Sequence, residues 1–67
     1  MKITIYSAIK NAGYTYGEVA DMLGITRQTL AKWNKGKTEP TYSQLIKLCE
    51  IVSTRDVIEP KDIFLPS

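Results

Sequence analysis

Five polar side chains near the middle of the chain have the types and spacing needed to recognise a ligand by hydrogen bonds. They are Thr26, Arg27, Gln28, Thr29 and Lys32. All can donate hydrogen bonds, and they lie within a segment whose other residues are mostly apolar. Arginine can pair bidentately with guanine O6 and N7, and glutamine with adenine N6 and N7. A helix with these groups on its open face is suited to reading base edges in a DNA major groove, although taken alone it could be an ordinary solvated face.

The stretch around these residues, 18–33, predicts two short helices joined by a tight turn. Ala20 lies where two helices must approach closely, and Gly24 lies where a left-handed backbone is cheapest for glycine. The apolar positions predicted to face the interior are Val19, Leu23, Ile25, Leu30 and Trp33. Trp33 could instead stack on a base, but its spacing from Leu30 favours the core.

Positive charge is concentrated between residues 27 and 37. The whole chain carries a net charge of +2, yet this window holds Arg27, Lys32, Lys35 and Lys37 and no acid. Such a concentration is the electrostatic footprint expected for contact with phosphates. On its own the cluster is equally compatible with a solvated lysine face.

Capping patterns and apolar periodicity divide the rest of the chain into short helical segments. The predicted helices cover residues 3–12, 16–23, 27–34 and 42–52, with a final turn over 60–64. Capping boxes begin at Thr15 and Thr41, and Thr26 is a predicted N-cap. The β-branched residues at 3–5 leave a short strand as an alternative to the start of the first helix. The predicted fold class is all-α, a compact bundle of about five short helices.

Length and composition exclude several classes of protein. With 67 residues, the sequence predicts a single domain over 1–67, which buries only roughly 60% of the surface that the unfolded chain exposes. One cysteine, Cys49, and no histidine exclude a disulfide and an ordinary zinc site, and Cys49 is expected to be a buried thiol. No apolar stretch approaches the ~20 residues needed to span a bilayer. We expect a cytoplasmic protein with no membrane partner.

The sequence contains few residues in arrangements that are typical of an active site. Glu18 and Asp21 are three positions apart and could form a carboxylate pair, but the capping box that starts at Thr15 already explains Glu18. There is no glycine-rich phosphate-binding loop. We therefore expect no enzymatic activity, no cofactor and no small-molecule ligand.

Most of the chain, from the first predicted helix to about Phe64, resembles the helix-turn-helix family of phage Cro and repressor proteins, also called Xre-type regulators. The residues that carry the resemblance are Thr15, Glu18, Val19, Ala20, Leu23, Gly24, Ile25, Thr26, Gln28, Thr29, Leu30, Trp33, Gly36, Lys37 and Pro40. The resemblance implies a compact lambda-repressor-like fold with a helix-turn-helix core at about 16–34. It also implies that the helix at 27–34 enters the major groove.

Two classes of DNA contact follow from the resemblance. The expected base-contacting residues are Arg27, Gln28 and Lys32, with Thr26 and Thr29 reaching bases or phosphates. The expected phosphate-contacting residues are Tyr16, Lys35, Gly36, Lys37, Thr41 and Tyr42.

The sequence departs from the family pattern at three places. Tyr16 stands where glutamine is usual, and Glu39 places an acid in a loop that is often basic. Ile9 and Asn34 stand where the family often has an Arg–Glu ion pair, so both partners of that pair are missing. Because both charged residues of the pair are missing, neither position is left with an unpaired charge.

The predicted function is therefore that of a sequence-specific, double-stranded DNA-binding transcriptional regulator, most similar to a phage or prophage repressor. One such domain buries too little surface for selective binding alone, so we expect a homodimer on an inverted-repeat operator. Part of an apolar tail could form the dimer contact; its residues are Val57, Ile58, Ile63, Phe64 and Leu65. Two alternatives remain at this point: an antitoxin-type protein-interaction module with secondary DNA binding, and a helical scaffold that has lost DNA binding.

Overall fold

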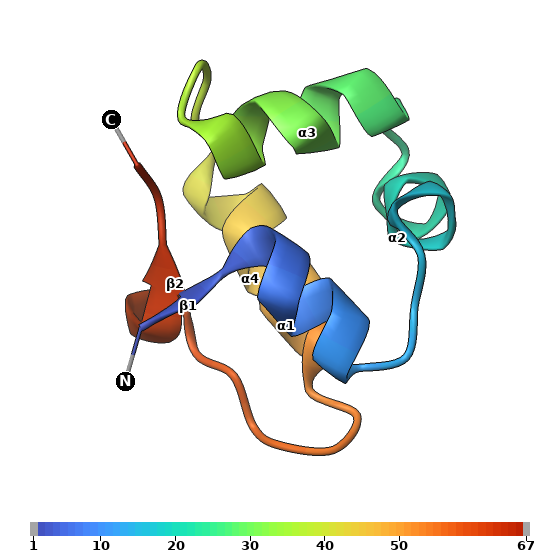
Figure 1. Ribbon diagram of the computed structural model, residues 1–67, viewed down its shortest axis with the longest axis vertical. Coiled ribbons are helices and arrows are strands. Elements are labelled where there is room, and N and C mark those ends of the chain that lie inside the picture. The colour runs from blue at the N-terminus through green and yellow to red at the C-terminus, as the bar shows by residue number, and fades with distance from the viewer. Residues whose placement is uncertain (1, 67) are drawn as a thin grey trace.

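The computed structural model describes residues 2–66, which form four α-helices, one short 3₁₀ helix and two short strands. The elements are β1 (Ile3–Thr4), α1 (Ile5–Asn11), α2 (Tyr16–Leu23), α3 (Arg27–Lys35), α4 (Tyr42–Val52), η1 (Pro60–Asp62) and β2 (Ile63–Phe64). In Figure 1, α3 extends along one side of the molecule and α2 stands at the end where α3 begins, while α1 and α4 form the centre. The predicted all-α fold class, a compact bundle of short helices, is confirmed, with four α-helices where about five helices were expected.

Local capping explains where three of the helices begin. At α2, the Thr15 N–H donates to Glu18 Oε1 at 2.9 Å, and the Glu18 N–H donates to Thr15 Oγ1 at 3.2 Å. The start of α4 repeats this pattern with Thr41 and Gln44, at 2.8 and 3.2 Å. Thr26 caps α3 by accepting from the Thr29 N–H at 3.1 Å. These bonds, which are reciprocal at α2 and α4, satisfy N–H groups that a helix start otherwise leaves without partners. The three helices therefore begin at the predicted residues.

The two ends of the chain pair with each other, and here the helix count differs from the expectation. β1 and β2 form a two-stranded parallel sheet in which Ile3 is opposite Ile63 and Thr4 is opposite Phe64. The first helix therefore begins at Ile5 and not at residue 3, and the strand that the sequence left as an alternative is the observed structure. The predicted helical turn at 60–64 is a single 3₁₀ turn followed by β2.

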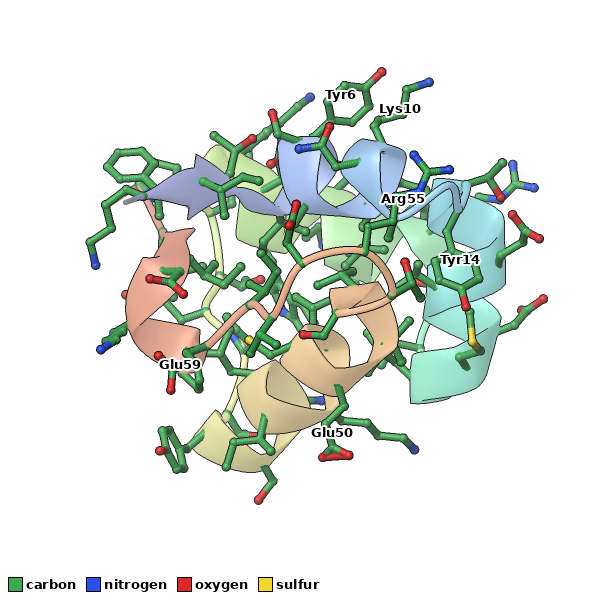
Figure 2. The ribbon with its side chains drawn as sticks, turned by 90° about the horizontal axis from the view of Figure 1, so that it is seen from below. Tyr6, Lys10, Tyr14, Glu50, Arg55 and Glu59 are labelled. Carbon is green, nitrogen blue, oxygen red and sulfur yellow. The ribbon has the colours of Figure 1, made fainter. Side chains whose placement is uncertain are left out.

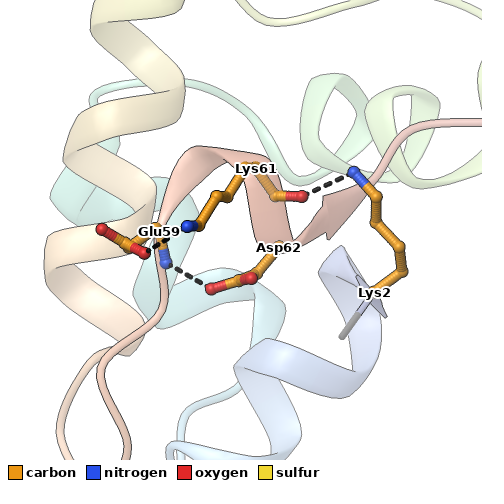
Figure 3. A network of polar contacts seen from close by, with 4 residues as sticks. All are labelled: Lys2, Glu59, Lys61 and Asp62. Carbon is orange, nitrogen blue, oxygen red and sulfur yellow. Dashed lines mark hydrogen bonds and ion pairs between the residues drawn. The ribbon is translucent and has the colours of Figure 1, made fainter.

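A small polar network fixes the 3₁₀ turn beside the sheet (Figure 3). The Glu59 N–H donates to Asp62 Oδ2 at 3.0 Å, and Lys61 Nζ lies 3.4 Å from Glu59 Oε2. Lys2 Nζ donates to the Lys61 carbonyl across the chain ends at 2.5 Å. The Glu59–Lys61 ion pair is exposed and contributes little by itself. Together these contacts stabilise the 3₁₀ turn and link it to Lys2, the residue before β1.

One apolar core joins the four α-helices with β2. Its buried residues are Ile5, Ala8, Ile9, Val19, Ala20, Leu30, Trp33, Leu48, Cys49, Val52 and Ile63. Trp33 is only 3% exposed, which confirms the core interpretation of this residue. Leu23 and Ile25, predicted to be interior, are half-buried against the core. No helix in residues 2–66 is long and apolar enough to cross a membrane.

The single thiol behaves as the sequence predicted, because Cys49 is buried. Burial raises the pKa of Cys49 from 9.0 to about 11, with a smaller contribution from the Asp62 carboxylate. At neutral pH the group is therefore a protonated thiol that packs as a small apolar side chain.

Asn34 connects the start of α1 to α3. Its Oδ1 accepts a hydrogen bond from the Tyr6 N–H at 3.0 Å, so the amide satisfies a donor at the first turn of α1. The contact occupies one of the two positions where the family often has an ion pair. Asn34 thus joins α1 and α3 by a hydrogen bond between neutral groups, where the family often has an ion pair between the same two helices.

Replacing Asn34 with alanine should lower the free energy of unfolding by about 1 kcal/mol, because the Tyr6 N–H loses its partner. Urea unfolding followed by circular dichroism measures the loss. Asn34→Asp keeps an acceptor oxygen and is the matched control, for which we expect a smaller loss. Equal losses in the two variants would contradict this role.

Candidate nucleic-acid interface

A tight turn between α2 and α3 sets the angle between the two helices. Gly24 follows α2 with a φ of 73°, and its N–H donates to the Asp21 carbonyl at 3.2 Å. The Ile25 N–H then donates to the Ala20 carbonyl at 3.0 Å. These bonds satisfy the last carbonyls of α2 and stop the helix, so that Thr26 can start α3 in a new direction. Ala20 is buried, as expected for a point where helices pack closely.

The two sides of α3 differ sharply in exposure. Leu30 and Trp33 face the core, whereas Arg27, Gln28 and Lys32 are exposed. The three predicted base-contacting side chains therefore lie on the solvent side of a helix whose other side is fixed by packing. Donors that project from a rigid helix keep a defined geometry relative to one another.

Thr26 and Thr29, two of the three threonines predicted to contact DNA, already form hydrogen bonds at the start of α3. Thr29 is half-buried, and its Oγ1 lies 3.0 Å from Thr26 Oγ1. Thr26 Oγ1 also accepts from the Thr29 N–H. Both hydroxyls therefore have a structural role in capping α3, and a contact of either to bases or phosphates stays a prediction.

The cations of the 27–37 window carry no compensating acid. Among residues 2–66 the structure contains one ion pair, between Lys61 and Glu59, which is outside this window. Lys32, Lys35 and Lys37 are exposed. Their positive charge is therefore available to an anionic partner.

The predicted phosphate-contacting residues lie at the starts of α2 and α4 and at the end of α3. Tyr16 is half-buried and meets Tyr6 edge to face, with ring centroids 5.6 Å apart. Burial raises the pKa of Tyr16, with a smaller contribution from Tyr6, so its phenol remains a hydrogen-bond donor at neutral pH. Thr41 is exposed, and Tyr42 is 70% exposed. Figure 2 shows Tyr6 and Lys10 side by side on the outer side of α1.

At the end of α3 the backbone donors are already occupied. The Gly36 N–H donates to the Trp33 carbonyl at 3.2 Å, and the Lys37 N–H donates to the Lys32 carbonyl at 3.0 Å. The side chains of Lys35 and Lys37, and not the backbone of this turn, are therefore the groups free to bind a phosphate.

Comparison with known proteins identifies the arrangement of α2, turn and α3. A family model described as helix-turn-helix matches residues 5–53, which run from the start of α1 to just beyond α4. The chain belongs to this helix-turn-helix family. The resemblance to phage Xre-type regulators is thereby confirmed at the level of the family.

One relative of the chain is named as a transcriptional regulator. The chain is 48% identical over 40 residues to the SPbeta prophage-derived uncharacterized HTH-type transcriptional regulator YonR of Bacillus subtilis (strain 168). The match covers 60% of this chain and 37% of the relative, so the chain spans little more than a third of the relative's length. No solved structure matches the chain.

Two features of this helix-turn-helix were not foreseen from the sequence, and both involve glycines that approach another part of the chain. A Cβ placed on Gly17 would lie 2.8 Å from Arg27 Nε. A Cβ on Gly36 would lie 2.0 Å from the Pro66 carbonyl oxygen, so the C-terminal segment covers the end of α3. In each case the partner is distant in sequence or reaches back across a turn, and no local pattern signals the contact.

Proposed function

We propose that this chain is a sequence-specific, double-stranded DNA-binding transcriptional regulator that places α3 in the major groove. The observation that carries the proposal is the exposed polar side of α3, where Arg27, Gln28 and Lys32 project from a helix anchored by Leu30 and Trp33. The cations nearby have no acidic partner among residues 2–66, which suits a polyanionic duplex. The family membership and the regulatory relative support the same conclusion.

In this proposal, base contacts and phosphate contacts belong to different residues. Arg27, Gln28 and Lys32 read base edges, and the first two have the donor geometry for guanine and adenine. Tyr16, Thr41 and Tyr42 bind phosphates at helix starts, and the side chains of Lys35 and Lys37 bind them at the end of α3, where the Gly36 N–H is already used by the Trp33 carbonyl. Phosphate contacts set the register on the duplex, and base contacts select the sequence.

Two substitutions separate these roles once a preferred site has been selected from a random duplex pool. Arg27→Ala should relax the preference at one base pair in each half-site. Lys37→Ala should instead weaken binding to all sequences alike and reduce the slope of log affinity against log salt by ~1. Affinities measured at several salt concentrations on the selected and a scrambled duplex report both effects. If the two variants behave identically, this division of roles is wrong.

We further propose that the protein acts as a homodimer on an inverted repeat and represses as a phage or prophage regulator. Two copies related by a two-fold axis would place their α3 helices about 34 Å apart, in successive major grooves. Val57 and Phe64 are 81% and 48% exposed and supply apolar surface for the contact between copies. The relative's prophage origin favours the phage setting.

The stoichiometry on DNA tests the dimer. Light scattering of the complex with the selected duplex should give two chains per duplex. A complex with one chain on a single half-site would reject this part of the proposal and leave the DNA-binding function standing.

A further inference from the structure

Arg27, the first residue of α3, reaches back across the turn and lies against the first turn of α2. A Cβ built on Gly17 would lie 2.8 Å from Arg27 Nε, 2.9 Å from Arg27 Nη2 and 3.2 Å from Arg27 Cζ. Real Cβ atoms essentially never approach another atom closer than 3.0 Å. The guanidinium therefore occupies space that exists only because residue 17 has no side chain.

The backbone gives no other reason for a glycine at this position. The chain has four glycines, and three of them, Gly13, Gly24 and Gly36, have the positive φ that favours glycine. Gly17 is not among them and lies inside α2, where alanine is the better helix former. The close approach of Arg27 is the feature at residue 17 that conflicts with a side chain there.

We propose that Gly17 is a positioning residue for Arg27, holding the guanidinium on α2 in an ordered position before DNA is bound. This inference rests on the proposed function, in which Arg27 reads a base edge. An arginine side chain loses conformational freedom when it is immobilised at an interface, and prior ordering reduces that loss. Because the crowded atoms are the far end of a flexible side chain, a methyl group at residue 17 displaces the guanidinium and leaves both helices in place.

The test is Gly17→Ala, alone and combined with Arg27→Ala. The single variant should bind the selected duplex roughly 2- to 10-fold more weakly than the unmodified protein and discriminate less at the base pair that Arg27 reads. Its thermal unfolding midpoint should be equal or higher, since alanine favours the helix. In the Arg27→Ala background, Gly17→Ala should have no further effect on affinity, because the residue through which it acts is gone.

A measurement without DNA separates this inference from the proposed function. In the free protein, nuclear magnetic resonance should show a nuclear Overhauser contact between Arg27 Hε and the Gly17 α-protons. Absence of that contact would overturn the inference, as would undiminished binding by Gly17→Ala or an equal loss in both backgrounds. If the unmodified protein binds no duplex at all, the proposed function fails and the DNA-reading role of the contact fails with it, while the resonance contact still decides whether Gly17 orders Arg27.

Discussion

Replacing Gly36 with alanine should lower the free energy of unfolding by at least about 2 kcal/mol, a large share of the stability of so small a domain. Two effects add. The residue has a φ of +80°, where a side chain is strained, and the new Cβ would lie 2.0 Å from the Pro66 carbonyl oxygen and 2.6 Å from its carbonyl carbon. Since these are backbone atoms, a side-chain rotation cannot relieve the clash, and the C-terminal segment must leave the end of α3. Urea unfolding measures the loss.

Gly24→Ala is the matched control. Gly24 has a similar φ of +73° and also ends a helix, but a Cβ there meets nothing within 4 Å. Its substitution should therefore cost about 1 kcal/mol, which is the conformational strain alone. Removing residues 66 and 67 from the Gly36→Ala variant should bring its extra loss down toward that of Gly24→Ala. Equal losses for the two alanine variants in the full chain would show that Pro66 does not pack on Gly36.

Replacing Arg27, Gln28 and Lys32 together with alanine should abolish selective DNA binding while the fold is kept. Two bidentate base contacts each discriminate by about 1–3 kcal/mol, so the preference for the selected over a scrambled duplex should fall roughly 30-fold or more. All three side chains are exposed, so the unfolding midpoint should change little. Titrations of both duplexes at a fixed salt concentration give the preference as a ratio of dissociation constants.

The control for this triple variant removes the same number of cations elsewhere. Lys47 and Arg55 are exposed and outside the predicted interface. Their joint replacement by alanine should weaken binding to both duplexes only slightly and leave the preference unchanged. If the control loses the preference as strongly as the triple variant, net charge and not the polar side of α3 accounts for selectivity.

The sequence alone was sufficient to predict those helix boundaries and exposed side chains whose signals lie within a few residues of each other. The reciprocal bonds of Thr15 with Glu18 and of Thr41 with Gln44 lie within four residues, and they place the starts of α2 and α4 where the capping boxes predicted them. Gly24 ends α2 in the left-handed conformation, also as predicted. Exposure of Arg27, Gln28 and Lys32 followed from the apolar spacing of the opposite side of the helix.

Features that depend on distant partners could not be derived in this way. Ile3 is in a strand because it pairs with Ile63, sixty positions along the chain, and local propensity offered this only as an alternative. The hydrogen bond between Asn34 and the Tyr6 N–H joins α3 to α1 and has no signal in either segment. The same holds for the Pro66 carbonyl on Gly36. These contacts are set by the three-dimensional packing and not by the pattern of one element.

Nuclear magnetic resonance of the complex with a duplex selected from a random pool locates the DNA on the protein. We expect intermolecular nuclear Overhauser contacts from the Gln28 and Lys32 side chains to major-groove protons, such as cytosine H5 and thymine methyl groups. Amide shifts should change most along α3 and at the start of α2. Contacts confined to minor-groove protons, or shift changes centred on α4 and the β1–β2 sheet with α3 unaffected, would contradict the placement of α3 in the major groove.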